Sequence, residues 1–193
     1  MARNNFEFKP DKEGPDLLSR LSLTQKQRQN LLKWGLYGLI LLFLSVLQDV
    51  FIPSFASIGI HTDLVPCAIF TICVIEGAES GSGFALAASL AYLFSGAAAG
   101  FHTVPILTFI AIGATIFRQS YLQKGFSATV LCVGISMLVY ETVIFLIALM
   151  LGMTFSARYG VFLMMAVLSS LLAPLLYPIF TAIGKIGGES WKE

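Results

Sequence analysis

The stretch WGLYGLILLFLSVLQDVFI, residues 34–52, decides the fold class of this chain. It contains a single charged residue, Asp49. As an α-helix it would be about 28 Å long, which is close to the ~30 Å thickness of the hydrocarbon core of a bilayer. Trp34 and Tyr37 at its start suit the interface between membrane and water. The stretch therefore predicts a transmembrane helix.

The composition extends this conclusion to most of the chain. Hydrophobic residues make up 56% of the 193 residues and charged residues only 12%, whereas soluble domains carry about 25% charged residues. No Lys or Arg occurs between residues 34 and 117. A water-facing surface built from such a segment would be unusual. The sequence therefore predicts an all-α integral membrane protein.

We expect a bundle of about six transmembrane helices. The expected spans are residues 34–52, 60–76, 81–97, 101–117, 126–151 and 160–183. The second span is short, because its apolar run at 64–75 would measure about 18 Å as a helix. One re-entrant hairpin over 64–97 is the alternative, and it would need shelter from neighbouring helices because lipid leaves free backbone groups unsatisfied. Pro174 and Pro178 predict a kink in the last span.

The distribution of basic residues predicts the orientation, because cytoplasmic segments carry the excess of Lys and Arg. With six spans and both termini in the cytoplasm, eleven of the twelve basic residues lie inside and only Arg158 lies outside. The chain then divides into a polar cytoplasmic segment at 1–33, a transmembrane helical domain at 34–186 and a cytoplasmic tail at 187–193. For residues 1–23, a solvated tail and an interfacial helix both stay open.

Acidic residues in or beside the spans are candidate functional residues, because a charge at the bilayer centre costs roughly 2.5–3.5 kcal/mol. The outer half of the expected bundle contains Asp49, Asp63, His102 and Glu141. We expect these residues to form a buried polar network or a partner contact, and a proton or cation site is the alternative. Glu76 and Glu79 fall at the inner surface, where we expect solvent or the basic loop at 118–125 to neutralise them.

Small residues recur at a spacing of four along the middle of the chain. Gly77 and Gly81 form one GxxxG pattern, and Gly96 and Gly100 form another. Such patterns let two helix backbones approach closely in a membrane. These four glycines are candidate helix-packing residues, either within the bundle or against the membrane helix of a partner.

Sequence motifs of enzymes are missing. The HExxH, GxSxG, Walker and GxGxxG patterns do not occur, and the three cysteines form no CxxC pair. We therefore predict no catalytic residues, no cofactor, no metal site and no nucleic-acid partner.

The order of segments resembles the MreD family of rod shape-determining membrane proteins over about residues 34–186. The resemblance lies in a short span that begins near Asp63, a glycine-rich turn, a small-residue helix, the turn SGAAAG at 95–100 and a helix that ends in a basic loop. The closing helix resembles the last span of the family in Pro174 and Tyr177. The chain departs from the family before the SG turn, where Tyr92, Leu93 and Phe94 replace a common acidic residue.

This resemblance implies a non-enzymatic role. MreD-like proteins lie in the bacterial cytoplasmic (inner) membrane and bind the bitopic protein MreC. They belong to the rod complex, or elongasome, which also contains MreB, RodA and a class B penicillin-binding protein and directs lateral peptidoglycan synthesis. The family is also similar in architecture to the substrate-binding S components of energy-coupling-factor transporters. A vitamin-binding S component is therefore the alternative, and it would need a polar pocket that opens outward.

Overall fold

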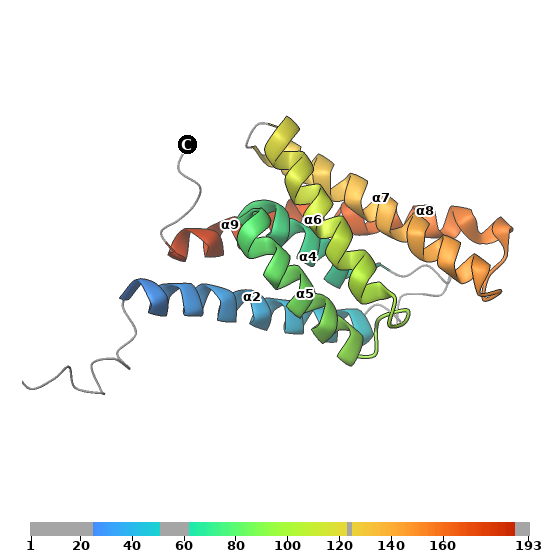
Figure 1. The fold of residues 1–193 in the computed structure, drawn as a ribbon, viewed down its shortest axis with the longest axis horizontal. Coiled ribbons are helices and arrows are strands. Elements are labelled where there is room, and N and C mark those ends of the chain that lie inside the picture. The colour runs from blue at the N-terminus through green and yellow to red at the C-terminus, as the bar shows by residue number, and fades with distance from the viewer. Residues whose placement is uncertain (1–24, 51–61, 123–124, 188–193) are drawn as a thin grey trace, which may run out of the picture.

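The computed structural model describes residues 25–50, 62–122 and 125–187. Within these residues the structure has seven α-helices, two short 3₁₀ helices and no strand, which confirms the predicted all-α class. The α-helices are α2 (Gln25–Val50), α4 (Leu64–Glu76), α5 (Ala78–Phe94), α6 (Thr103–Tyr121), α7 (Phe126–Met150), α8 (Tyr159–Ser170) and α9 (Ala173–Gly184). The 3₁₀ helices are η1 (Ser156–Arg158) and η2 (Lys185–Gly187). Figure 1 shows the helices gathered into one bundle.

Three helices, α2, α6 and α7, are long and apolar enough to cross a membrane. The bent pair formed by η1–α8 and α9 makes a fourth span if it is counted as one. The 13 residues of α4 and the 17 of α5 correspond to about 20 Å and 26 Å, less than the ~30 Å hydrocarbon core. The described helices thus account for three to four spans by length and composition, and the total of about six stays a prediction.

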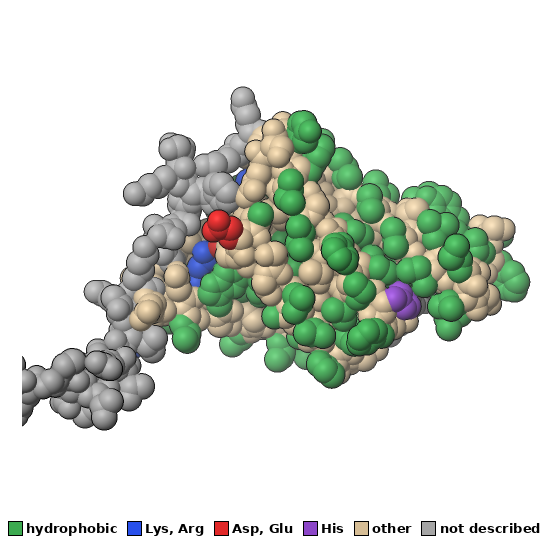
Figure 2. Space-filling view, in the orientation of Figure 1, with side chains coloured by type: hydrophobic (Ala, Val, Ile, Leu, Met, Phe, Trp, Pro, Cys, Tyr) green, Lys and Arg blue, Asp and Glu red, His purple; other side chains and the backbone are tan. Residues whose placement is uncertain are grey.

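Large apolar side chains cover the outside of the bundle. Leu39 of α2, Phe109 of α6 and Met164 of α8 are each more than half exposed. Figure 2 shows apolar groups spread over the whole described part of one face. Soluble monomers rarely expose contiguous apolar patches above a few hundred Å². The surface is therefore compatible with lipid surroundings.

The short helix α4 forms the centre of the bundle. Every side chain from Leu64 to Val74 is buried. The helix contacts α2, α5, α6, α7, α8 and α9, and Figure 1 shows it enclosed among its neighbours. A helix that is apolar on all sides is stable only where every side is covered. The other helices therefore form a shell around α4.

Gly77, which was expected to be a helix-packing residue, lies between α4 and α5 and lets the chain reverse. Its φ of +94° lies in the region that favours glycine, and its N–H donates to the Cys73 carbonyl at 3.0 Å. One turn later, Gly81 of α5 lies against α4, where an added Cβ would be 3.0 Å from the Cys73 carbonyl oxygen. Gly81 therefore allows a close helix–helix contact within the bundle.

The expected last span is interrupted between α8 and α9, where the chain bends by 41°. Pro174 lies in the first turn of α9, where its missing N–H removes no intrahelical hydrogen bond. The interruption therefore lies just before Pro174, and Pro178 lies within α9.

The first helix begins at Gln25, inside the segment 1–33 that was expected to be a separate polar unit. Residues 25–33 are mostly good helix formers such as Gln, Lys, Arg and Leu, and they continue into the apolar run. The two alternatives for residues 1–23 lie outside the described residues, as does most of the tail at 187–193.

Replacing Gly81 by Ala tests the contact between α4 and α5. The added methyl would meet the Cys73 backbone, and we expect a loss of about 1–3 kcal/mol in the free energy of unfolding. Thermal unfolding in detergent, monitored by circular dichroism, should show this loss as a lower melting temperature. Gly83→Ala is the matched control, because nothing lies within 4 Å of a Cβ there, and it should be neutral or stabilising. Equal effects of the two substitutions would contradict the close contact.

Candidate functional site

A pocket of about 340 Å³ lies at the N-terminal end of α4. Its lining residues come from α2, α5, α7, α8, the turn after α5 and the residue that precedes α4. Asp49 and Ala99 line the pocket and are exposed, so the pocket reaches the surface of the bundle. The site therefore exists only when at least four helices are assembled around α4.

Three of the four residues expected to form the outer polar group line this pocket: Asp49, Asp63 and Glu141. Glu141 is only 2% exposed, and its carboxyl interacts with that of Asp63. The two carboxyl groups are hydrogen-bonded to each other, and the buried Oε1 atom of Glu141 has no other hydrogen-bond partner. Two neighbouring carboxylates repel each other when both are charged. The pocket therefore has three acidic side chains in its lining, and two of them share a hydrogen bond.

The fourth expected residue, His102, is not among the residues that line the pocket. It precedes α6, and its ring lies against Gly100, where an added Cβ would be 2.8 Å from the ring. The structure thus places His102 with the turn between α5 and α6 and apart from the three acids.

Three polar residues of the pocket were not expected from the sequence: Gln48, Tyr92 and Tyr140. The side chain of Gln48 accepts a hydrogen bond from the Val65 N–H at 3.1 Å and donates to the Tyr92 hydroxyl at 3.4 Å. The sequence feature that could have predicted Gln48 is its position, because it is a polar residue beside Asp49 near the end of an apolar run.

The start of α4 is capped by other helices. Gln48 of α2 accepts from Val65, and the Ser169 hydroxyl of α8 accepts a hydrogen bond from the Asp63 N–H at 2.8 Å. The first N–H groups of a helix have no partner within the helix. These two side chains supply partners from distant parts of the chain and tie α2 and α8 to the floor of the pocket.

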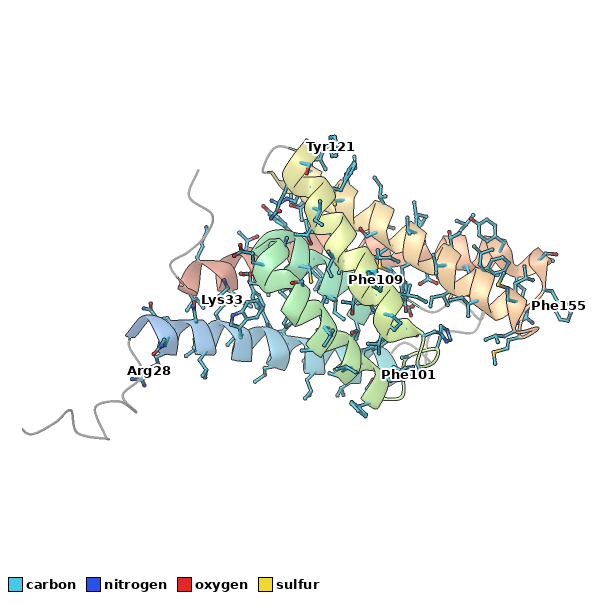
Figure 3. All side chains as sticks on the ribbon, viewed as in Figure 1. Arg28, Lys33, Phe101, Phe109, Tyr121 and Phe155 are labelled. Atoms are coloured by element: carbon cyan, nitrogen blue, oxygen red, sulfur yellow. The ribbon has the colours of Figure 1, made fainter. Side chains whose placement is uncertain are left out.

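The opposite end of α4 carries a buried ion pair. Lys33 Nζ of α2 lies 2.5 Å from Glu76 Oε2, and both side chains are 7% exposed. The Tyr37 hydroxyl donates to Glu76 Oε1 at 2.6 Å and also lies 3.1 Å from the Phe180 carbonyl oxygen. Figure 3 shows Lys33 at this end of the bundle, and Figure 2 shows basic and acidic side chains next to each other there.

The ion pair corrects the expectation for Glu76, which pairs with Lys33 in the first helix. Arg118, from the basic loop expected to neutralise Glu76, donates a hydrogen bond to the Val74 carbonyl at the end of α4. Lys124 lies outside the described residues, and Glu79 is exposed. Sequence distance hid the contact, since Lys33 and Glu76 are 43 residues apart.

The second glycine pair also needs correction. Gly96 and Gly100 lie in the turn between α5 and α6 and are not on a helix. Their φ values of +81° and +154° are positive, and an added Cβ at Gly96 would meet no atom within 4 Å. These two glycines serve the backbone conformation of the turn and form no helix-packing face.

The described residues contain no group of three or more His, Cys, Asp or Glu side chains placed to hold a metal ion. The three cysteines are free and buried. The pocket offers carboxyl, amide and phenol groups for binding, together with the apolar side chains of Phe162 and Met165.

No protein-family model matches this chain, and neither does any curated protein or solved structure.

Removing one partner of the ion pair tests its contribution. Lys33→Met leaves the Glu76 carboxylate buried without its cation, and breaking such pairs costs about 3–5 kcal/mol. We expect a clear fall in melting temperature in detergent, and the double variant Lys33→Met/Glu76→Gln should recover part of it. Arg28→Met is the control, because Arg28 is exposed on the same helix. Similar losses for Lys33→Met and Arg28→Met would show that the buried pair contributes little.

Proposed function

We propose that this protein is a non-enzymatic scaffold of the bacterial rod complex. It lies in the cytoplasmic membrane as a multi-pass protein and binds the membrane helix of an MreC-like bitopic protein. Through that partner it acts indirectly with MreB, RodA and a class B penicillin-binding protein. In this role it supports cell shape and lateral peptidoglycan synthesis.

One observation carries the proposal: the segments that resemble the MreD family coincide with separate elements of the bundle. The short apolar span is α4, which starts directly after Asp63. The glycine turn is the break at Gly77, and the SG turn connects α5 to α6. The helix before the basic loop is α6, with Arg118 in its last turn. Each segment on which the resemblance rests therefore corresponds to one helix or turn of the structure.

The charges at the two ends of α4 support the proposed orientation, with about six crossings and both termini in the cytoplasm. Lys33 and Arg118 both lie at the C-terminal end of α4. Asp49, Asp63 and Glu141 gather at the N-terminal end. Cytoplasmic ends carry the basic residues, so the end with Lys33 faces the cytoplasm.

A scaffold also needs a lipid-facing surface that a partner helix can approach. An apolar groove of about 240 Å³ runs between α6 and α7, and its small residues include Gly113, Ala114 and Ser136. Small side chains at such a surface allow close approach of two helices in lipid. We assign this groove to the helix of the MreC-like partner.

The acidic pocket favours a second candidate, a substrate-binding S component of a vitamin transporter. Such a protein needs a polar pocket that opens outward, and the pocket at Asp63 and Glu141 has this character. The two functions differ in what accompanies the protein. A scaffold associates with a bitopic membrane protein, and an S component associates with a transporter ATPase module and a vitamin.

Purification of the detergent-solubilised protein from its native host tests the proposal. We expect an MreC-like chain to copurify, and depletion of the protein should turn rod-shaped cells round without a change in vitamin uptake. A stoichiometric vitamin with an ATPase module, and no MreC-like chain, would contradict the scaffold and favour the S component.

A matched pair of variants then tests the groove. Gly113→Leu places a larger side chain in it at a position where nothing lies within 4 Å of an added Cβ, and we expect it to reduce recovery of the MreC-like chain. Gly83→Leu is the control on α5, which is equally open and lies outside the groove. If Gly113→Leu retained the partner as well as Gly83→Leu did, the groove would not be the contact surface.

A further inference from the structure

The pocket at the N-terminal end of α4 has features of a small-molecule binding site that the scaffold function does not require. Its volume of about 340 Å³ lies at the lower end of the range of about 300–1,000 Å³ that is usual for small-molecule sites. Glu141 lines the pocket, its carboxyl group is hydrogen-bonded to that of Asp63, and its buried Oε1 has no other hydrogen-bond partner. Buried polar atoms in proteins nearly always have partners. The paired carboxyl groups at the pocket therefore keep acceptor capacity that the protein itself does not use, and a ligand with a donor group can use it.

The charge of the pocket determines the kind of ligand. The residues that line it include Asp49, Asp63 and Glu141 and, among the described residues, no Lys, Arg or His. A hydrogen bond between the carboxyl groups of Asp63 and Glu141 requires a proton on one of them. A cation can take the place of that proton, whereas an anion would be repelled by the remaining carboxylate and by Asp49. The positive end of α4 does not reverse this preference, because Ser169 and Gln48 already accept the hydrogen bonds of the Asp63 and Val65 N–H groups.

The remaining walls favour an organic cation over a metal ion. The described residues have no group of three acidic, histidine or cysteine side chains placed to coordinate a metal. Instead Tyr92, Tyr140, Phe162 and Met165 give the pocket aromatic and thioether surfaces. Ammonium groups are attracted to aromatic faces, and apolar bodies are attracted to such walls.

We propose that this pocket binds a small organic cation, an ammonium group on an apolar or aromatic body. The ammonium group donates to the paired carboxyl groups of Asp63 and Glu141, and the body of the molecule lies against the tyrosines, Phe162 and Met165. Asp49 at the exposed edge attracts the cation as it enters. The binding site is distinct from the groove between α6 and α7, so it does not depend on the scaffold function.

Two probes of the same shape and different charge test this proposal on the full chain in a neutral detergent. Benzylamine is a cation at pH 7, and benzyl alcohol is its neutral counterpart. Isothermal titration calorimetry should show saturable binding of benzylamine, with at least about tenfold weaker binding of benzyl alcohol. No saturable binding of benzylamine, or equal affinity for the two probes, would overturn the proposal.

Variants of the pocket locate the binding. Glu141→Gln keeps the shape of the side chain and removes its charge, and we expect at least about tenfold weaker benzylamine binding. Glu79→Gln makes the same change at an exposed position outside the pocket and should bind like the parent protein. Equal affinity of these two variants would overturn the proposal.

Asp49→Asn is a second variant in case Glu141→Gln fails to fold. Asp49 is exposed, so this substitution should leave the fold intact. It should weaken benzylamine binding by about threefold, as expected for a solvent-exposed charge, and the difference should shrink at high salt. Unchanged benzylamine affinity in Asp49→Asn at low salt would contradict the role of the acidic edge.

Discussion

A helix leaves its first N–H groups and its last carbonyl groups without partners of its own, and both ends of α4 lie among the other helices of the bundle. In lipid each such group costs several kcal/mol if it stays unsatisfied. At one end the N–H groups of Asp63 and Val65 donate to Ser169 and Gln48. At the other end Arg118 donates to the Val74 carbonyl. The helices α2, α6 and α8 are thereby tied to the ends of α4.

The helix dipole explains why the two ends of α4 differ in charge. Negative groups are favourable at the N-terminus of a helix and positive groups at its C-terminus. Asp63 directly precedes α4, and Glu141 joins it in the pocket. Lys33 and Arg118 lie at the other end, where Glu76 closes the contact as a buried ion pair. An acidic pocket that reaches the surface therefore lies at one end of the central helix, and a buried ion pair lies at the other. The groove between α6 and α7 shares no lining residue with the pocket, so the proposed partner helix and the proposed cation have separate sites.

The sequence predicted the parts of this arrangement that depend on local composition. Asp49, Asp63 and Glu141 were predictable as a group, because isolated acids in apolar segments share a depth in the membrane. Their neighbours Tyr92 and Tyr140 were not, because the rotation of a helix that is apolar on all sides cannot be inferred from its periodicity. The ion pair between Lys33 and Glu76 joins residues 43 positions apart, and it depends on α2 extending back into the segment at 1–33, which the composition predicted to be a separate polar unit. At Gly96 and Gly100, a spacing of four indicated a helix where the backbone forms a turn.

The enclosure of α4 by protein can be measured in the membrane with an apolar diazirine that dissolves in the bilayer and, on illumination, labels side chains in contact with lipid. Mass spectrometry of the digested protein then locates the label. Leu39 and Phe43 of α2 and Leu131 of α7 are more than half exposed, and their peptides should be labelled. Leu64 to Val74 are buried, and their peptide should carry little or no label. Labelling of α4 at the level found in α2 and α7 would show that lipid contacts this helix, and it would contradict a bundle built around an enclosed α4.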